Sequence, residues 1–294
     1  MNLHDRDAVI QRIRLELYRG NPRVALRLAE DAQAADPRPE YAVQAERIRK
    51  SLAHMENPAA YARAYERYYR RLRARFGFKR LEKEIRILLG RKTAKMVARN
   101  ARKPEVQLLE REVLAVEPAR VFDAGCGEGR VALTIAARHP ELRVDAVDVS
   151  PTNIRIASKL NRFPNCAFHL GLIEEVARAF PAGSFDLAYS FDVLEHVSDV
   201  DEVMAAIVRL LRPAGRVCFA VPMHEFVATG PLPEFTFEDE APGHVRVFTE
   251  EELRARFGGH DGFVLQRIAG ELPEKYPEHL RPVAFGSYFV AFSA

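Results

Sequence analysis

The stretch V-F-D-A-G-C-G-E-G-R at residues 121–130 decides the fold prediction. An apolar run leads directly into a glycine-rich turn, which is typical of a strand that ends at a nucleotide site. A dinucleotide turn of the form G-x-G-x-x-G would require a glycine at position 130, where this chain has Arg130. The carboxylate of Asp123 would also repel a diphosphate at close range. The turn therefore predicts a ligand that carries positive charge and no phosphate.

Outward from this turn, strand-like and helix-like segments alternate from about residue 106 onward. Alternating elements of these lengths predict a parallel sheet with helices on its faces. Two further strand-like runs, G-F-V-L-Q-R-I-A-G at 262–270 and G-S-Y-F-V-A-F-S-A at 286–294, are expected to pair antiparallel at the sheet edge. The fold class is therefore α/β.

S-adenosylmethionine has an ammonium and a sulfonium and lacks phosphate, so it fits the turn. The second predicted strand ends at Asp148, where a carboxylate can accept hydrogen bonds from ribose hydroxyls. The motif D-x-G-x-G-x-G, this acid, and the stretches F-D-L-A-Y-S-F-D-V-L-E-H-V and L-L-R-P-A-G-R-V-C-F-A-V-P together resemble the class I S-adenosylmethionine-dependent methyltransferases over residues 106–294. The resemblance implies a Rossmann-like sheet of seven strands whose last strand is antiparallel.

The same resemblance assigns the cofactor contacts. The glycine turn would hold the methionine end and Asp148 the ribose. Similar proteins often place an aspartate for the adenine amino group where this chain has Leu172, but the backbone N–H of Ile173 can still face the ring. The predicted cofactor-binding residues are Asp123, Gly125, Cys126, Gly127, Gly129, Asp148, Val149, Leu172, Ile173 and Phe191.

Candidates for the chemistry follow the fourth predicted strand. A helix that begins near Asp192 would place Asp192, Glu195 and His196 on one face. With His244, which precedes a helix predicted to be capped by Thr249, these residues form a candidate octahedral site for Mg²⁺ or Mn²⁺. The stretch resembles the E-x-x-E-H stretch of ubiquinone-pathway O-methyltransferases and of enzymes that 2′-O-methylate small-RNA ends, where it is thought to hold a divalent metal.

Two alternatives need no metal. His196 could act as a general base with Glu195 behind it, or both residues could serve only to position neighbouring groups. His224, just after the fifth predicted strand, is a second candidate base.

The N-terminal third is predicted to be helical. Residues 1–55 read as a helical hairpin with a weak likeness to a tetratricopeptide repeat, and residues 56–105 as a basic helical arm. Between Arg67 and Lys103 the chain has fifteen Lys and Arg against two Glu, so a polyanion or a carrier could bind there. The same positions could instead form an ordinary solvated face. The helices could also support a homodimer.

Composition narrows the class of protein. The sequence shows no apolar stretch of the ~20 residues that span a bilayer, and three widely spaced cysteines favour the cytoplasm. The first function predicted is O-methylation of a small molecule in a biosynthetic or tailoring pathway. The alternatives are an RNA 2′-O-methyltransferase that uses the basic arm, and a non-enzymatic scaffold that only binds the cofactor.

Overall fold

The computed structural model describes residues 9–10, 12–13, 16, 22–55, 57, 59–60, 62–63, 66–67, 91–197, 199–225, 248–270 and 284–294. The strands are β1 (Arg120–Ala124), β2 (Arg143–Asp148), β3 (Cys166–Leu170), β4 (Phe185–Phe191), β5 (Leu211–Glu225), β6 (Val264–Gly270) and β7 (Ala284–Ser293). The helices are α2 (Pro22–Ala35), α3 (Pro39–Met55), α6 (Arg91–Asn100), α7 (Pro104–Val116), α8 (Arg130–Arg138), α9 (Pro151–Leu160), α10 (Ile173–Ala179), α11 (Val200–Leu210) and α12 (Glu250–Phe257).

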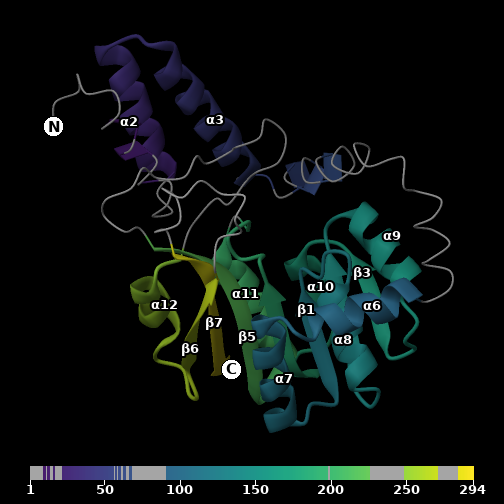
Figure 1. The fold of residues 1–294 in the computed structure, drawn as a ribbon. Helices are drawn as coiled ribbons and strands as arrows, with labels where there is room; N and C mark the ends of the chain where they lie inside the picture. The colour runs from purple at the N-terminus through teal and green to yellow at the C-terminus, as the bar shows by residue number, and fades with distance from the viewer. Residues whose placement is uncertain are drawn as a thin grey trace.

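The strands form one seven-stranded sheet in the order β3-β2-β1-β4-β5-β7-β6 (Figure 1). Strands β1 to β5 are parallel, and β7 runs antiparallel to both β5 and β6. The predicted seven-stranded sheet with an antiparallel last strand is therefore confirmed. The strand order reverses between β1 and β4, which is the place where open α/β sheets bind ligands.

Both faces of the sheet are covered, because successive residues of a strand point to opposite sides. In β1, Val121 belongs to the core that includes residues of α7, α8 and α9, whereas Phe122 belongs to the core that includes residues of α10, α11 and α12. Tyr288 and Phe289 divide in the same way in β7. This double burial explains why the strands read as apolar runs.

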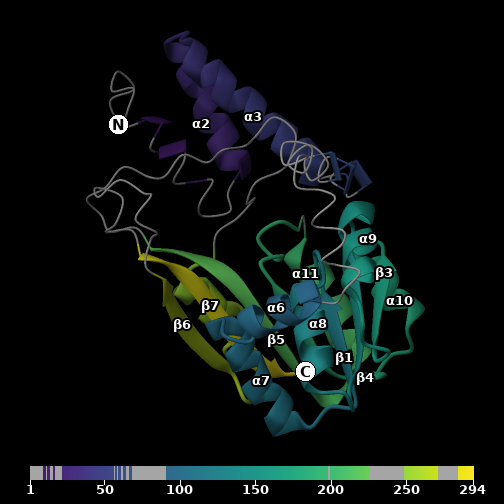
Figure 2. The same ribbon diagram turned by 45° about the vertical axis from the view of Figure 1, so that its right-hand side comes forward.

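The N-terminal hairpin of α2 and α3 has a core of its own. Ala25, Ala29 and Ala32 recur at helical spacing and are fully buried against Tyr41 and Ile48. Small side chains let the two helix axes approach closely. In Figures 1 and 2 the hairpin lies apart from the sheet.

The C-terminal part of the basic arm, helix α6, is bonded to the sheet domain. Thr93 in α6 donates to the carbonyl of Leu160 at 2.8 Å, and Asn100 donates to the carbonyl of Arg130 at 3.0 Å. Helix α6 is thereby held across α8 and α9.

One helix was predicted in the wrong place. The chain forms a turn at residues 194–196, and α11 begins only at Val200. Asp192 has a positive φ of 55°, which interrupts a right-handed helix, and Asp199 caps α11 by accepting from the backbone N–H groups of Asp201 and Glu202. The charged residues therefore do not share a helix face.

Candidate functional site

A cavity of about 510 Å³ opens at the carboxyl ends of β1, β2 and β4. Of the ten residues predicted to bind the cofactor, Gly129 alone does not line this cavity. A Cβ on Gly129 would lie 2.7 Å from the ring of Phe168, so this glycine allows close packing. The other nine predicted residues all line this cavity, which their spacing along the sequence could not establish.

The glycine turn leaves room for a ligand. Gly125 and Gly127 have φ angles of +94° and +54°, a region that favours glycine. A Cβ on Gly125 would come within 2.3 Å of Val193, so a larger residue cannot be accommodated without movement. A Cβ on Gly127 would meet no protein atom within 4 Å, and Gly127 lines the cavity. The open space beside Gly127 is therefore available to a bound molecule.

Asp148 holds this turn against the start of α9. Its Oδ2 accepts from the Gly127 N–H at 2.8 Å, and its Oδ1 accepts from the Ser150 N–H at 2.8 Å and from Asn153 Nδ2 at 3.2 Å. Burial raises the pKa of this carboxyl, and these hydrogen bonds oppose the rise. Asp148 thus shapes the cavity as well as lining it.

Asp123 is a buried acid that lines the same cavity, with 2% of its surface exposed. The parallel register of β1 and β4 places it opposite Tyr189, whose hydroxyl donates to Asp123 Oδ2 at 2.7 Å. Burial raises the pKa of Asp123 to about 8, and the nearby charge of Asp148 adds to the rise. A cation in the cavity would offset that cost, so the site fits the ammonium or sulfonium of S-adenosylmethionine.

Two of the residues predicted for catalysis or metal binding line the same cavity. Asp192 and His196 line it, whereas Glu195 is buried behind them with 1% of its surface exposed. His196 Nε2 lies 3.9 Å from Glu195 Oε1. Burial raises the pKa of Glu195 to about 8, and the charge of Asp192 contributes. His196 therefore lines the cavity, with its Nε2 toward the Glu195 carboxyl group and its Nδ1 buried.

The predicted metal site is only partly described. Within the part of the chain that the structure describes, no three His, Cys, Asp or Glu side chains gather as metal ligands. His244 lies outside the described residues, so the set of Asp192, Glu195, His196 and His244 remains a prediction. His224 belongs to β5, where it pairs with Phe285, but its side chain is not described and its role as a base remains a prediction.

Several residues at the cavity were not predicted from the sequence. Asn100, Lys103 and Glu105 line it from the basic segment, and Lys103 Nζ lies 3.2 Å from Glu105 Oε1. No local motif marks them, because α6 and α7 reach the cavity only once the sheet is assembled. Tyr189 and Asn153 also line it and were missed for the same reason.

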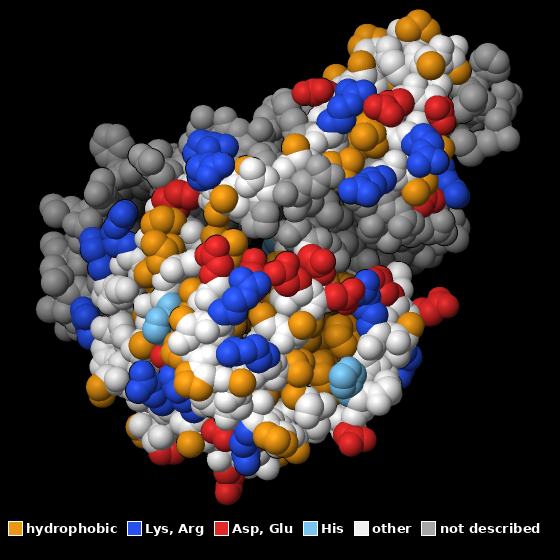
Figure 3. All heavy atoms as spheres, turned by 180° about the vertical axis from the view of Figure 1, so that it is seen from behind, with side chains coloured by type: hydrophobic (Ala, Val, Ile, Leu, Met, Phe, Trp, Pro, Cys, Tyr) orange, Lys and Arg blue, Asp and Glu red, His pale blue; other side chains and the backbone are white. Residues whose placement is uncertain are grey.

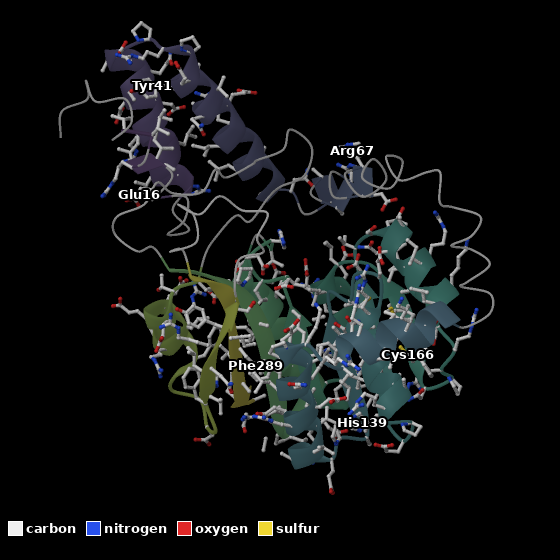
Figure 4. The ribbon with its side chains drawn as sticks, in the orientation of Figure 1. Glu16, Tyr41, Arg67, His139, Cys166 and Phe289 are labelled. Atoms are coloured by element: carbon white, nitrogen blue, oxygen red, sulfur yellow. The ribbon has the colours of Figure 1, made fainter. Side chains whose placement is uncertain are left out.

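Glu66 of the basic arm, residues 56–105, contacts the sheet domain at the start of α9. Glu66 accepts from Ser150 Oγ at 2.6 Å and also bonds the hydroxyl of Thr152, at the first turn of α9. A carboxylate is favourable there because the N-terminus of a helix is electropositive. Its neighbour Arg67, labelled in Figure 4, marks where the arm passes this end of the sheet.

Comparison with known proteins agrees with this architecture. The family model described as a methyltransferase domain matches residues 61–266, more than half of the chain. The chain is 34% identical over 134 residues to trans-aconitate 2-methyltransferase of Deinococcus radiodurans, which covers 45% of this chain and 50% of that protein. It is 33% identical over 101 residues to ubiquinone biosynthesis O-methyltransferase of Xanthomonas oryzae, which covers 34% of this chain and 41% of that protein.

A third relative, malonyl-[acyl-carrier protein] O-methyltransferase of Halalkalibacterium halodurans, is 31% identical over 119 residues, with 39% of this chain and 44% of that protein covered. The matched regions thus span half or less of these relatives. Among solved structures, phosphoethanolamine N-methyltransferase 2 of Haemonchus contortus, in complex with S-adenosylmethionine, aligns with a TM-score of 0.48 and 18% identity over 62% of this chain and 52% of that one. The chain belongs to the methyltransferase domain family of class I S-adenosylmethionine-dependent methyltransferases.

Proposed function

We propose that this protein transfers the methyl group of S-adenosylmethionine to an oxygen atom of a small molecule. The observation that carries the proposal is the continuity of one cavity. It joins the cradle formed by Asp123, Gly127 and Asp148 to the imidazole of His196. A cofactor held in this cradle would present its methyl group to an acceptor beside His196.

The chemistry asks little of the protein beyond alignment and one proton transfer. The acceptor oxygen attacks the methyl carbon, the carbon–sulfur bond breaks, and S-adenosylhomocysteine leaves with the electron pair. For a hydroxyl acceptor, His196 would take the proton, and the Glu195 carboxyl behind it would stabilise the imidazolium. A carboxylate acceptor would need no base. Two of the three relatives described above are named O-methyltransferases, which supports an oxygen acceptor.

Small molecules are favoured over RNA as acceptors. Over the described atoms of the face in Figure 3, acidic and basic side chains are intermixed rather than gathered in one basic surface. Acidic Glu105, Glu128 and Asp192 line the cavity beside Lys103 and Arg130, which is unfavourable for a phosphate backbone.

Among the described residues, no helix has the length and apolar character to cross a membrane. The three cysteines are free thiols, which supports the cytoplasmic assignment.

The test is transfer of labelled methyl groups from S-adenosylmethionine to a panel of phenols, aliphatic hydroxy acids, polycarboxylates and short RNAs. We expect transfer to an oxygen of one small-molecule class, at a rate that responds weakly to added salt. Transfer to RNA that falls steeply with salt would support the RNA alternative instead. A protein that does not bind S-adenosylmethionine in calorimetry would support the scaffold alternative.

A further inference from the structure

Asn153 carries a buried polar atom that the described structure does not satisfy. The residue lies in the first turn of α9, is 1% exposed and lines the cavity. Its backbone N–H donates to Ser150 Oγ, and its Nδ2 donates to Asp148 Oδ1 at 3.2 Å. Its Oδ1 is buried and has no hydrogen-bond partner among the described residues. A buried acceptor without a donor is costly, so such atoms are expected to meet a ligand or water.

The orientation of this amide is determined by its neighbour. Asp148 already accepts from the backbone N–H groups of Gly127 and Ser150, which identifies its carboxylate as the acceptor in the network. If the amide were turned over, Asn153 Oδ1 would face Asp148 Oδ1, two acceptors without a proton between them. The NH₂ group of Asn153 therefore faces Asp148. The amide oxygen of Asn153 then has no hydrogen-bond donor among the described residues.

We propose that Asn153 Oδ1 accepts a hydrogen bond from one ribose hydroxyl of S-adenosylmethionine while Asp148 accepts from the other. The inference rests on the proposed function and on the predicted contact of Asp148 with the ribose. The ribose of this cofactor presents two neighbouring hydroxyl donors, and the side chains of Asp148 and Asn153 offer two adjacent acceptors. Asn153 thereby makes the site selective for an intact diol.

The alternative donor in the cofactor is the amino group of adenine. Asn153 is in α9, which lies on the same face of the sheet as α7 and α8, whereas Ile173, expected at the base, begins α10 on the opposite face. The adenine ring is therefore assigned to the side of Ile173 and the ribose to the side of Asn153.

The first experiment uses the unaltered protein. Calorimetry would compare S-adenosylhomocysteine with its 2′-deoxy analogue, its 3′-deoxy analogue and an analogue that lacks the 6-amino group of the base. We expect each deoxy analogue to bind about 10-fold more weakly, the usual effect of one lost hydrogen bond in a buried site. If both deoxy analogues bind as tightly as S-adenosylhomocysteine, the inference is overturned.

The second experiment assigns the contact to Asn153. In Asn153→Leu, which keeps the shape of the side chain, affinity for S-adenosylhomocysteine should fall about 10-fold, and discrimination against one deoxy analogue should disappear. Asn161→Leu makes the same chemical change outside the residues that line the cavity and should leave the discrimination ratios unaltered. Circular dichroism and thermal melting would show that both variants are folded.

The outcomes separate the inference from the proposed function. If Asn153→Leu keeps both discrimination ratios, or loses discrimination against the analogue without the 6-amino group, the ribose contact of Asn153 is refuted while cofactor binding stands. If the unaltered protein does not bind S-adenosylhomocysteine, the proposed function and this inference fall together.

Discussion

The buried acid at the glycine turn makes cofactor binding depend on pH in a defined direction. With a pKa of about 8 in the ligand-free protein, Asp123 is ionised to about a tenth at pH 7 and about a hundredth at pH 6. A bound cation favours the carboxylate and lowers this pKa, so binding releases a proton from Asp123. The affinity for S-adenosylmethionine should therefore rise with pH, by about tenfold between pH 6 and pH 7.

The assay is titration calorimetry between pH 6.0 and pH 7.5, below the range in which the cofactor's own amino group titrates, at about 7.7–8.0. Measurements in two buffers that differ in ionisation enthalpy would give the number of protons released, which should approach one at pH 6. Asp123→Asn is the matched control, because its amide can still accept from Tyr189 but cannot ionise. Its affinity should not change with pH through this group.

Tyr189→Phe adds a second control with a predicted sign. The tyrosine hydroxyl stabilises the charged form of Asp123, so its removal should raise the pKa of Asp123 further. The affinity for S-adenosylmethionine should then be lower at every pH in the range, and its rise of about tenfold per pH unit should continue to pH 7.5. If the unaltered protein releases no proton, or if Asp123→Asn has the same pH slope, Asp123 does not face the cofactor's positive charge.

Three further predictions address other parts of the site. Asp148→Ala removes the acceptor of three hydrogen bonds as well as the ribose contact, so calorimetry should show at least about 30-fold weaker cofactor binding; unchanged affinity would show that the ribose lies elsewhere. For a hydroxyl acceptor, His196→Ala should lower kcat by about 10²–10⁴ with little change in cofactor affinity, and a loss of affinity without a loss of kcat would contradict the base role. If a divalent metal takes part, EDTA should abolish turnover and Mg²⁺ or Mn²⁺ should restore it, whereas full activity in chelator would remove the metal prediction and leave His196 as the base.

The features of this protein that could be predicted from its sequence are local ones. The glycine turn after an apolar strand, the acid that ends the second strand and the cap of α12 at Thr249 each depend on a few consecutive residues, and the structure has all three. Strand order followed from the resemblance to a known family, because pairing between distant strands leaves no mark in a single sequence.

The missed features depend on register and on backbone conformation. Asp123 and Tyr189 are 66 residues apart and become neighbours only through the pairing of β1 with β4. The spacing of Asp192, Glu195 and His196 fits a helix, but the left-handed conformation at Asp192 places these residues in a turn instead. Sequence periodicity does not show that a single residue has a positive φ. Aspartate adopts this conformation more readily than most residues, so Asp192 could interrupt the helix.

The most direct test of the central claim is a crystal structure grown with equal concentrations of S-adenosylhomocysteine and NAD. We predict density for S-adenosylhomocysteine alone, with its amino acid end at the glycine turn, its ribose between Asp148 and Asn153, and its base beside Ile173. Density for NAD with its diphosphate against residues 123–129 would contradict the account.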